Sequence, residues 1–139
     1  MSFLLDTCVL SEIVKPQPNA GLVNWLAKQN SNTLFISSLT LGELSKGIAK
    51  LAEGQRKAFL ADWLNTQVIQ NFSSRVLDLD AAVALEWGAT QAESEAMWKT
   101  LHLMDSLIAA TAKTHQLTLV TRNMKDMQLV GLKLLNPWN

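Results

Sequence analysis

One segment, residues 102–126, constrains the fold of this chain more than any other. It joins a helical pattern containing Ala109, Ala110 and Ala112 to a short apolar run at residues 117–120, and a polar stretch follows. An apolar run of this length is typical of a buried strand in a parallel sheet, and the small alanines allow the helix to lie close against that sheet. Because open α/β sheets bind ligands at the carboxyl ends of their strands, the segment predicts a site just after this strand.

The rest of the chain repeats the alternation of strand and helix. Strand patterns occur at residues 3–5, 33–37, 76–79, 117–120 and 132–135, and helical patterns lie between them. Asn19 and Asp80 are expected to cap two of these helices, and the helix carrying Trp63 is expected to end near residue 66. Residues 93–99 are expected to form a polar approach to the helix that carries Asp105. Strands that alternate with helices favour a parallel sheet covered on both faces and joined by right-handed crossovers. The predicted fold class is therefore α/β, a three-layer α/β/α arrangement with a central parallel sheet of four to five strands. At 139 residues we expect a single domain, residues 1–139.

Composition excludes several classes of protein. Lys+Arg and Asp+Glu both number 12, so the net charge is zero, which argues against indiscriminate attraction to nucleic acid but permits a local basic rim. The single cysteine, Cys8, cannot form an intrachain disulfide, which points to a reducing cytoplasm. No apolar stretch approaches the roughly 20 residues of a membrane helix. We expect a cytoplasmic protein with no membrane segment.

Four acidic side chains fall where a parallel sheet would bring them to one edge. Asp6 follows the first strand, Glu43 lies in the first turns of the helix after the second, Asp105 heads the helix before the fourth, and Asp126 follows the fourth. Mg²⁺ and Mn²⁺ prefer oxygen ligands, and clustered acids repel one another without a cation. The four acids therefore predict a divalent-metal site, and such a site suits phosphodiester hydrolysis by an activated water.

Each acid also has a simpler structural interpretation. Asp6 is placed to cap a helix N-terminus, Thr40 and Glu43 form a capping-box pattern, Asp105 lies near a helix start, and Asp126 stands in a polar loop. Capping and metal binding do not exclude each other. Only the joint placement of the acids favours the metal site, and spacing alone leaves both interpretations open.

Five stretches of the sequence resemble the PIN-domain family, in particular its VapC/FitB type, the ribonuclease toxins of bacterial toxin–antitoxin pairs. They are residues 4–12 (LLDTCVLSE), 38–44 (SLTLGEL), 104–112 (MDSLIAATA), 121–126 (TRNMKD) and 135–138 (LNPW). The resemblance covers essentially the whole chain in the family's order. Each motif is weak alone, whereas the set in register, with the final Asn-Pro-Trp, is specific.

The resemblance implies a doubly wound sheet that binds Mg²⁺ or Mn²⁺ at its acidic edge and cleaves RNA endonucleolytically. Asp6, Glu43 and Asp105 match the family's core acids, and Asp126 matches a fourth. Some members carry an acid where this chain has Asn123, which could still ligate through its amide oxygen. The resemblance also implies a cognate antitoxin as partner and assembly as a homodimer or a higher toxin–antitoxin complex.

Two positions depart from the family's pattern. Cys8 stands where Asn is common, which removes a polar group beside Asp6 and leaves open whether activity is full strength. Met127 stands where an aromatic residue is usual, and this substitution is typical of a core position. We expect Cys8 to be an inert thiol, because neither His102 nor His115 has an evident link to it.

Substrate and partner contacts follow less directly from the sequence. Residues that flank the strand ends and could touch phosphate are Thr7, Ser38, Thr121 and Arg122. Lysines that could supply a basic rim are Lys15, Lys46, Lys50, Lys99 and Lys125. Sequence-specific RNA readers usually take unpaired loops, so an RNA loop is the expected substrate. The helix carrying Trp63, with the apolar helices before it, is expected to form either a partner groove or ordinary core.

Two rival functions remain open. A catalytically silent PIN-like module could use the apolar helices only to bind a partner, and Cys8 makes that conceivable. A signalling receiver domain is also doubly wound and would use Asp78 or Asp80 as phosphoacceptor, but Asp6 has no adjacent acid, which that class requires. The glycines form no phosphate-binding loop, and Cys and His do not have zinc-binding spacing.

Overall fold

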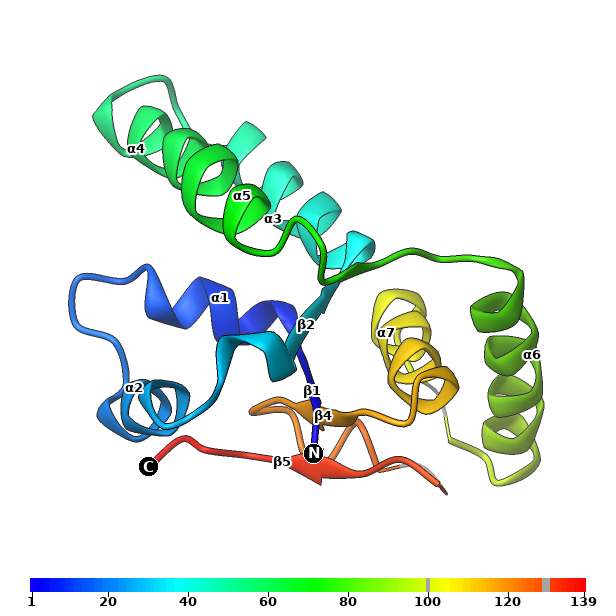
Figure 1. Ribbon diagram of the computed structural model, residues 1–139. Helices are drawn as coiled ribbons and strands as arrows, with labels where there is room; N and C mark the ends of the chain where they lie inside the picture. Colours follow the sequence, from blue (N-terminus) through cyan, green and yellow to red (C-terminus); the bar gives the residue numbers. More distant parts are fainter. Residues whose placement is uncertain (100, 129–130) are drawn as a thin grey trace.

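A computed structural model describes residues 1–99, 101–128 and 131–139. Over these residues the centre is a five-stranded, fully parallel sheet with strand order β3-β2-β1-β4-β5 (Figure 1). The strands are β1 Phe3–Leu5, β2 Leu34–Ser37, β3 Val76–Leu77, β4 Thr118–Val120 and β5 Leu134–Leu135. The predicted α/β class with a central parallel sheet is confirmed, and the first strand of the chain occupies the middle of the sheet.

Helices cover both faces of the sheet. They are α1 Thr7–Ile13, α2 Ala20–Ala27, α3 Ser38–Ala49, α4 Gln55–Trp63, α5 Ile69–Asn71, α6 Ala81–Ala96 and α7 Leu103–Thr114, with a short 3₁₀ helix η1 Ser31–Thr33 and a π-helical turn η2 Leu64–Val68. In Figure 1, α1 and α2 lie on one side of the sheet, α6 and α7 on the other, and α3 to α5 form a group beyond one edge. The three-layer arrangement follows directly.

The sequence of β1 explains how one strand serves two cores. Successive side chains of a strand point to opposite faces. Phe3 and Leu5 therefore pack with α1, α2 and α3, whereas Leu4 packs with Ile108 and Ala109 of α7. All three residues of β1 are buried, as expected for a central parallel strand.

The alanine-rich helix lies where its composition predicts. Ala109, Ala110 and Ala112 of α7 are fully buried, because only small side chains fit a helix that lies this close to the sheet. Met127 is also fully buried, and it packs in the same cluster as Leu4. The interpretation of Met127 as a core substitution is therefore consistent with its place in the fold.

Several helix boundaries differ from expectation. The segment 93–99 was expected to be a polar approach to α7, but α6 continues through Ala96 and ends before Trp98, which has a positive φ of 59°. Ser94 is buried on this last turn, so the helix has a packed face that its polar composition hides. The helix carrying Trp63 was expected to end near residue 66, yet the π-helical turn continues it into α5.

The expected caps of two helices are present. Asn19 accepts a hydrogen bond from the backbone N–H of Leu22 at the start of α2, at 3.1 Å. Asp80 accepts one from Val83 at the start of α6, at 3.0 Å. Of the helices that the structure describes, none has the length and apolar character needed to cross a membrane.

Candidate active site

An open cleft of about 360 Å³ lies at the carboxyl ends of β1 and β4, beside the start of α7. Its lining is Asp6, Thr7, Cys8, Glu43, Asp105, Arg122 and Asn123. These residues come from four separate parts of the chain, and their side chains are almost all polar. The structure thus brings three of the four predicted acids to one place, at the edge of the sheet where they were expected.

Asp6 is the most firmly held of these acids. It directly follows β1, and it is only 6% exposed. Its carboxylate accepts hydrogen bonds from the backbone N–H of Thr7 and from the hydroxyl of Thr121, both at 2.8 Å. Its own backbone N–H donates to the carbonyl of Val120 at 2.9 Å. Asp6 is indeed the N-cap of α1, and it lines the cleft as well, so the two interpretations hold together.

Glu43 is held by a hydroxyl from α1. Its carboxylate accepts a 2.6 Å hydrogen bond from Thr7, whose oxygen lies 3.0 Å from the hydroxyl oxygen of Thr40. The capping-box interpretation of Thr40 and Glu43 was wrong, because Thr40 lies inside α3 and does not cap it. Its N-cap is Ser37, whose hydroxyl accepts from the backbone N–H of Leu39 at 3.0 Å. Glu43 is therefore available to the cleft.

Asp105 lies in the first turn of α7, half-buried, and the N-cap of that helix is His102 rather than Asp105. Burial raises the pKa of Asp105 above its usual value, and the negative charges of Asp6 and Glu43 raise it further, while His102 acts in the opposite direction. The three carboxylates therefore share one electrostatic field. Bringing them together has a cost that a bound cation would remove.

The fourth oxygen ligand was left open between Asn123 and Asp126. Asn123 lines the cleft, and its backbone N–H donates to the hydroxyl of Thr121 at 3.0 Å. Asp126 is exposed and is not among the lining residues. Its effect on the pKa of Asp105 is smaller than the effects of Asp6 and Glu43. The structure therefore does not bring Asp126 into the cleft, because the polar loop carries it beyond the strand end.

The side chains of the cleft fit a hard divalent cation in their chemistry. Asp6, Glu43 and Asp105 offer carboxylate oxygens, and Asn123 offers an amide oxygen. Across the described ranges, no three His, Cys, Asp or Glu side chains form a ready-made metal cage. Magnesium commonly keeps several waters and binds through a few carboxylates together with substrate phosphate. An open cleft lined by oxygen atoms leaves room for these waters and for the phosphate. The raised pKa of Asp105 reflects the repulsion that a cation would relieve.

The predicted substrate contacts divide into three kinds. Thr121 is fully buried and donates to Asp6, so its assignment as a substrate contact was wrong and it positions a carboxylate instead. Thr7 lines the cleft but directs its hydroxyl to Glu43. Ser38 is half-buried at the start of α3 and is not among the lining residues. Arg122 is exposed and lines the cleft, so it offers a cation at the mouth.

Part of the expected basic rim lies beside this cleft. Lys46 and Lys50 line an adjacent hollow together with Glu43 and Met104. Lys15 instead forms an ion pair with Glu12 at 3.0 Å. The remaining rim lysines are Lys99, which reaches the carbonyl of Gln128 at 3.4 Å, and Lys125, which is exposed.

Cys8 lies at the cleft beside Asp6. Its sulfur is 3.7 Å from a carboxylate oxygen of Asp6 and 3.7 Å from the hydroxyl oxygen of Thr121. Burial raises the pKa of the thiol, and the charge of Asp6 raises it further. A thiol held in its protonated form is a poor nucleophile, which agrees with the expected inert role and leaves Cys8 as a weak donor to Asp6.

Sequence reasoning missed two contributors. Thr40 was read as part of a cap, although its buried hydroxyl contacts Thr7 beneath Glu43. Its spacing of three residues from Glu43 on one helix face was a usable signal. Trp138 lies under Arg122, with 5.7 Å between the guanidinium carbon and the ring centre, and no local pattern in the sequence indicates that contact.

The receiver interpretation does not fit this geometry. Asp80 caps α6 through Val83, and Asp78 follows β3, which lies at the edge of the sheet and pairs with β2 rather than β1. Neither residue lines the cleft that contains Asp6. A phosphoacceptor site would need these acids together, so the rival loses its support.

The fold and the cleft define a class of doubly wound α/β proteins whose acidic side chains gather at the carboxyl edge of a parallel sheet. The family model described as "PIN domain" matches residues 3–129, and the chain belongs to the PIN-domain family. Among its relatives, Toxin FitB of Neisseria gonorrhoeae is 35% identical over 136 residues, which cover 98% of each chain. The tRNA(fMet)-specific endonuclease VapC of Shigella flexneri is 32% identical over 141 residues, covering 100% of this chain and 99% of that one.

Solved structures agree with these sequence relatives. The crystal structure of FitAcB from Neisseria gonorrhoeae matches with a TM-score of 0.93 and 34% identity, covering 99% of each chain. The structure of FitAB bound to an IR36 DNA fragment also matches with a TM-score of 0.93, at 32% identity, covering 99% of this chain and 96% of that chain. The resemblance to the VapC/FitB type is thereby confirmed.

Proposed function

We propose that this chain is a metal-dependent endoribonuclease and the toxin of a type II toxin–antitoxin pair. The observation that supports the proposal most strongly is the convergence of Asp6, Glu43, Asp105 and Asn123, from distant parts of the sequence, on one open cleft. Relatives of full length bear the names VapC ribonuclease and tRNA(fMet)-specific endonuclease VapC. The shared family, together with the acidic cleft of this chain, supports the same class of reaction here.

The proposed ligands of Mg²⁺ or Mn²⁺ are Asp6, Glu43 and Asp105, with Asn123 or, through the loop, Asp126. A divalent ion supplies a more acidic water and stabilises charge on the attacking and leaving oxygens. The contribution of the chain is positional. Thr121 and the Thr7 amide hold Asp6, and the Thr7 hydroxyl holds Glu43. Arg122, at the mouth, is placed to bind the phosphate of an unpaired RNA loop, and cleavage breaks a P–O bond with water.

The proposed partner is a cognate antitoxin. An apolar groove of about 280 Å³ lies beside the cleft, lined in part by Val14, Ile48, Leu51, Leu60 and Trp63. Thr7 and Glu43 line both the groove and the cleft. A chain lying in the groove would thus reach the acids directly. The relative FitB is named a toxin, and the solved relatives FitAB and VapBC2 of Rickettsia felis are each bound to a DNA fragment. We place the complex in the cytoplasm and expect the toxin to form a homodimer or a higher assembly.

The test is cleavage of a fluorescein-labelled RNA hairpin with an unpaired loop by the purified chain. We expect cleavage with Mg²⁺ or Mn²⁺, none with excess EDTA, and none by the Asp105→Asn variant at equal folded concentration. The same comparison in growing cells, followed by mapping of RNA ends, would identify the natural substrate. Cleavage that persists undiminished in Asp105→Asn would overturn the proposal.

The alternative is a silent binding module, and Cys8 is the observation behind it, because a weak donor stands beside Asp6. The same assay separates the two functions. A chain that fails to cleave RNA with either metal ion, yet binds its partner through the apolar groove, would be the silent module. Recovery of cleavage in the Cys8→Asn variant would show that this one substitution is responsible.

A further inference from the structure

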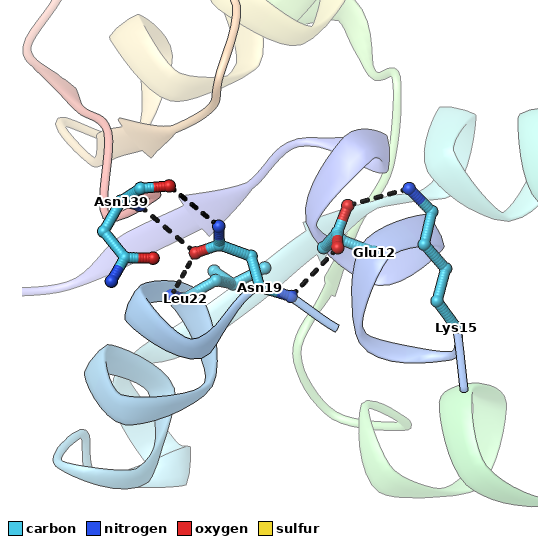
Figure 2. Close-up of polar contacts among 5 residues, drawn as sticks. All are labelled: Glu12, Lys15, Asn19, Leu22 and Asn139. Carbon is cyan, nitrogen blue, oxygen red and sulfur yellow. Dashed lines mark hydrogen bonds and ion pairs between the residues drawn. The ribbon is translucent and has the colours of Figure 1, made fainter. Parts of the chain in front are cut away.

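The last residues of the described chain are hydrogen-bonded to the start of α2. Asn139 donates its backbone N–H to the side-chain oxygen of Asn19 at 3.2 Å, and the side-chain amide of Asn19 donates to the carbonyl of Asn139 at 3.0 Å (Figure 2). The side-chain oxygen of Asn139 accepts from the backbone N–H of Gly21 at 3.1 Å. A Cβ atom on Gly21 would lie 2.7 Å from the carbonyl oxygen of Pro137, so the tail packs directly on the helix.

These hydrogen bonds and the contact at Gly21 fix the position of Trp138, which directly precedes Asn139. The ring is half-buried against the core cluster that includes Phe3 and Leu22. Its backbone N–H donates to the side-chain oxygen of Asn136 at 3.0 Å. Among the described residues the buried indole N–H has no acceptor at bonding distance, although it lies close enough to Glu12 to lower the pKa of that carboxyl. Packing therefore contributes most to holding the ring.

The carboxylate of Glu12 contributes to the same corner of the molecule, where the end of the chain meets the start of α2. Its carboxylate accepts from Lys15 and from the backbone N–H of Asn19, both at 3.0 Å (Figure 2). These hydrogen bonds lower the pKa of Glu12, that with Lys15 most, and the nearby indole of Trp138 lowers it least. The corner is therefore a connected set of polar contacts around an aromatic ring.

Arg122 lies over that ring at the mouth of the cleft. Its guanidinium carbon is 5.7 Å from the centre of the Trp138 ring, within the range of a cation–π contact. Arg122 itself is exposed and lines the cleft. A long exposed arginine without such a contact samples many rotamers, and ordering it has an entropic cost. The ring therefore restricts the guanidinium to one side of the acidic cleft.

We propose that Trp138 is a positioning residue that holds the guanidinium of Arg122 where an RNA phosphate meets the cleft. The inference rests on the proposed ribonuclease function and adds a residue to it that lies outside the cleft. Trp138 does not touch the substrate, because Arg122 stands between them. Its effect is on substrate affinity, whereas the bond-breaking step depends on the acids.

The test measures KM and kcat for the labelled RNA hairpin with Mg²⁺. Exposed cation–π contacts are worth about 0.5–1 kcal/mol, so we expect Trp138→Leu to raise KM roughly two- to fivefold with kcat within about twofold of wild type. Arg122→Gln should raise KM at least as much. The double variant should match Arg122→Gln alone, because the ring acts only through the arginine.

The chain offers a matched control in Phe72, whose ring lies 4.8 Å from the guanidinium carbon of Arg75 and packs on the same core cluster. Neither residue lines the cleft. Phe72→Leu should lower thermal stability while leaving KM unchanged. An equal rise of KM in Phe72→Leu and Trp138→Leu would overturn the inference, since both would then act through general loss of packing.

Trp138→Phe keeps the inference testable should Trp138→Leu fold poorly. Phenylalanine is a weaker cation–π partner than tryptophan, so KM should rise in the order wild type, Trp138→Phe, Trp138→Leu. The role of Trp138 would be overturned if Trp138→Phe, and Trp138→Leu where it folds, had the same KM as wild type. The proposed nuclease function would then still stand, provided that the wild type cleaves the RNA. Absence of metal-dependent cleavage by the wild type itself overturns both.

Discussion

The two sides of the acidic cleft are built differently. On the sheet side, Asp6 is almost fully buried and accepts hydrogen bonds from Thr7 and Thr121. On the helix side, Asp105 is half-buried, and its pKa is raised by burial and by its acidic neighbours. One carboxylate is stabilised by donors that the fold supplies, and the other carries the electrostatic cost of the arrangement.

The difference teaches how such a cleft can be both stable and ready for a cation. Donors at the ends of two paired strands fix Asp6 without any ligand, because strand pairing sets their positions. The unrelieved repulsion is concentrated at Asp105, where a cation would gain most from binding. This contrast can be tested by substituting residues on each side of the cleft separately.

The largest expected effect is on catalysis and does not distinguish the two sides. Asp6→Asn and Asp105→Asn should each reduce RNA cleavage by more than about a hundredfold. Mutating a residue that only hydrogen-bonds to a metal ligand commonly lowers metal affinity or activity by about 10–100-fold, and loss of a ligand itself should have a larger effect. Circular dichroism should show that both variants fold. A folded Asp6→Asn protein that still cleaves within a few fold of wild type would remove Asp6 from the site.

The next effect separates the sides by stability. Thr121→Val removes a donor to the buried carboxylate of Asp6. Leaving such a group unsatisfied costs about 1–3 kcal/mol, and we expect a loss of this size in urea unfolding, with cleavage reduced about tenfold. Thr7→Val, which removes the donor to the half-buried Glu43, should cost less stability. Equal losses in the two variants would contradict the contrast in burial.

A smaller effect concerns the loop after β4. Asn123 lines the cleft and Asp126 does not, so Asn123→Ala should lower cleavage by about tenfold and Asp126→Ala by less than about threefold, on the scale of outer metal partners. The ratio of kcat/KM for the two variants at saturating Mg²⁺ gives the answer. The reverse order would show that the loop closes Asp126 onto the cation.

The smallest expected effect is on thermal stability without metal. A raised pKa means that folded Asp105 binds a proton more tightly than the unfolded chain does, so its contribution to stability grows as pH falls through the raised pKa. At neutral pH the ionised carboxylate destabilises the fold. Asp105→Asn should therefore raise Tm by less than about 5 °C at pH 7, and the difference should vanish in acid.

Mg²⁺ provides the control for this prediction. A ligand that binds only the folded state raises Tm, so the ion should stabilise wild type more than Asp105→Asn. A variant that is less stable than wild type at pH 7 without metal would show that Asp105 is not the strained side of the cleft.

The parts of the fold that could be predicted rest on local patterns. The five strands were predicted from short apolar runs, and the caps at Asn19 and Asp80 from single polar residues before helices. The capping box at Thr40 and Glu43 was wrong because a second capping pattern lies just before it, at Ser37, and Ser37 is the N-cap of α3. The end of α6 was misplaced because a polar helix with one packed face has no strong apolar period.

The parts of the site that could not be predicted depend on the pairing of strands that are far apart in the sequence. Asp6 and Glu43 were placed from the strand ends that precede them, which is a local argument. The donation from Thr121 to Asp6 exists because β4 pairs with β1. The contact of Trp138 with Arg122 exists because β5 pairs with β4. Sequence reasoning named Arg122 and Thr121 but could not assign their partners.

The central place of β1 has a consequence for synthesis of the chain on the ribosome. Asp6 emerges early, yet Thr121, its hydroxyl donor, follows 115 positions later. At elongation rates of about 5–20 residues per second, the nascent chain spends roughly 6–23 s without that neighbour. During translation the first strand has no completed sheet to join, so the cleft cannot assemble until nearly all of the polypeptide has been made.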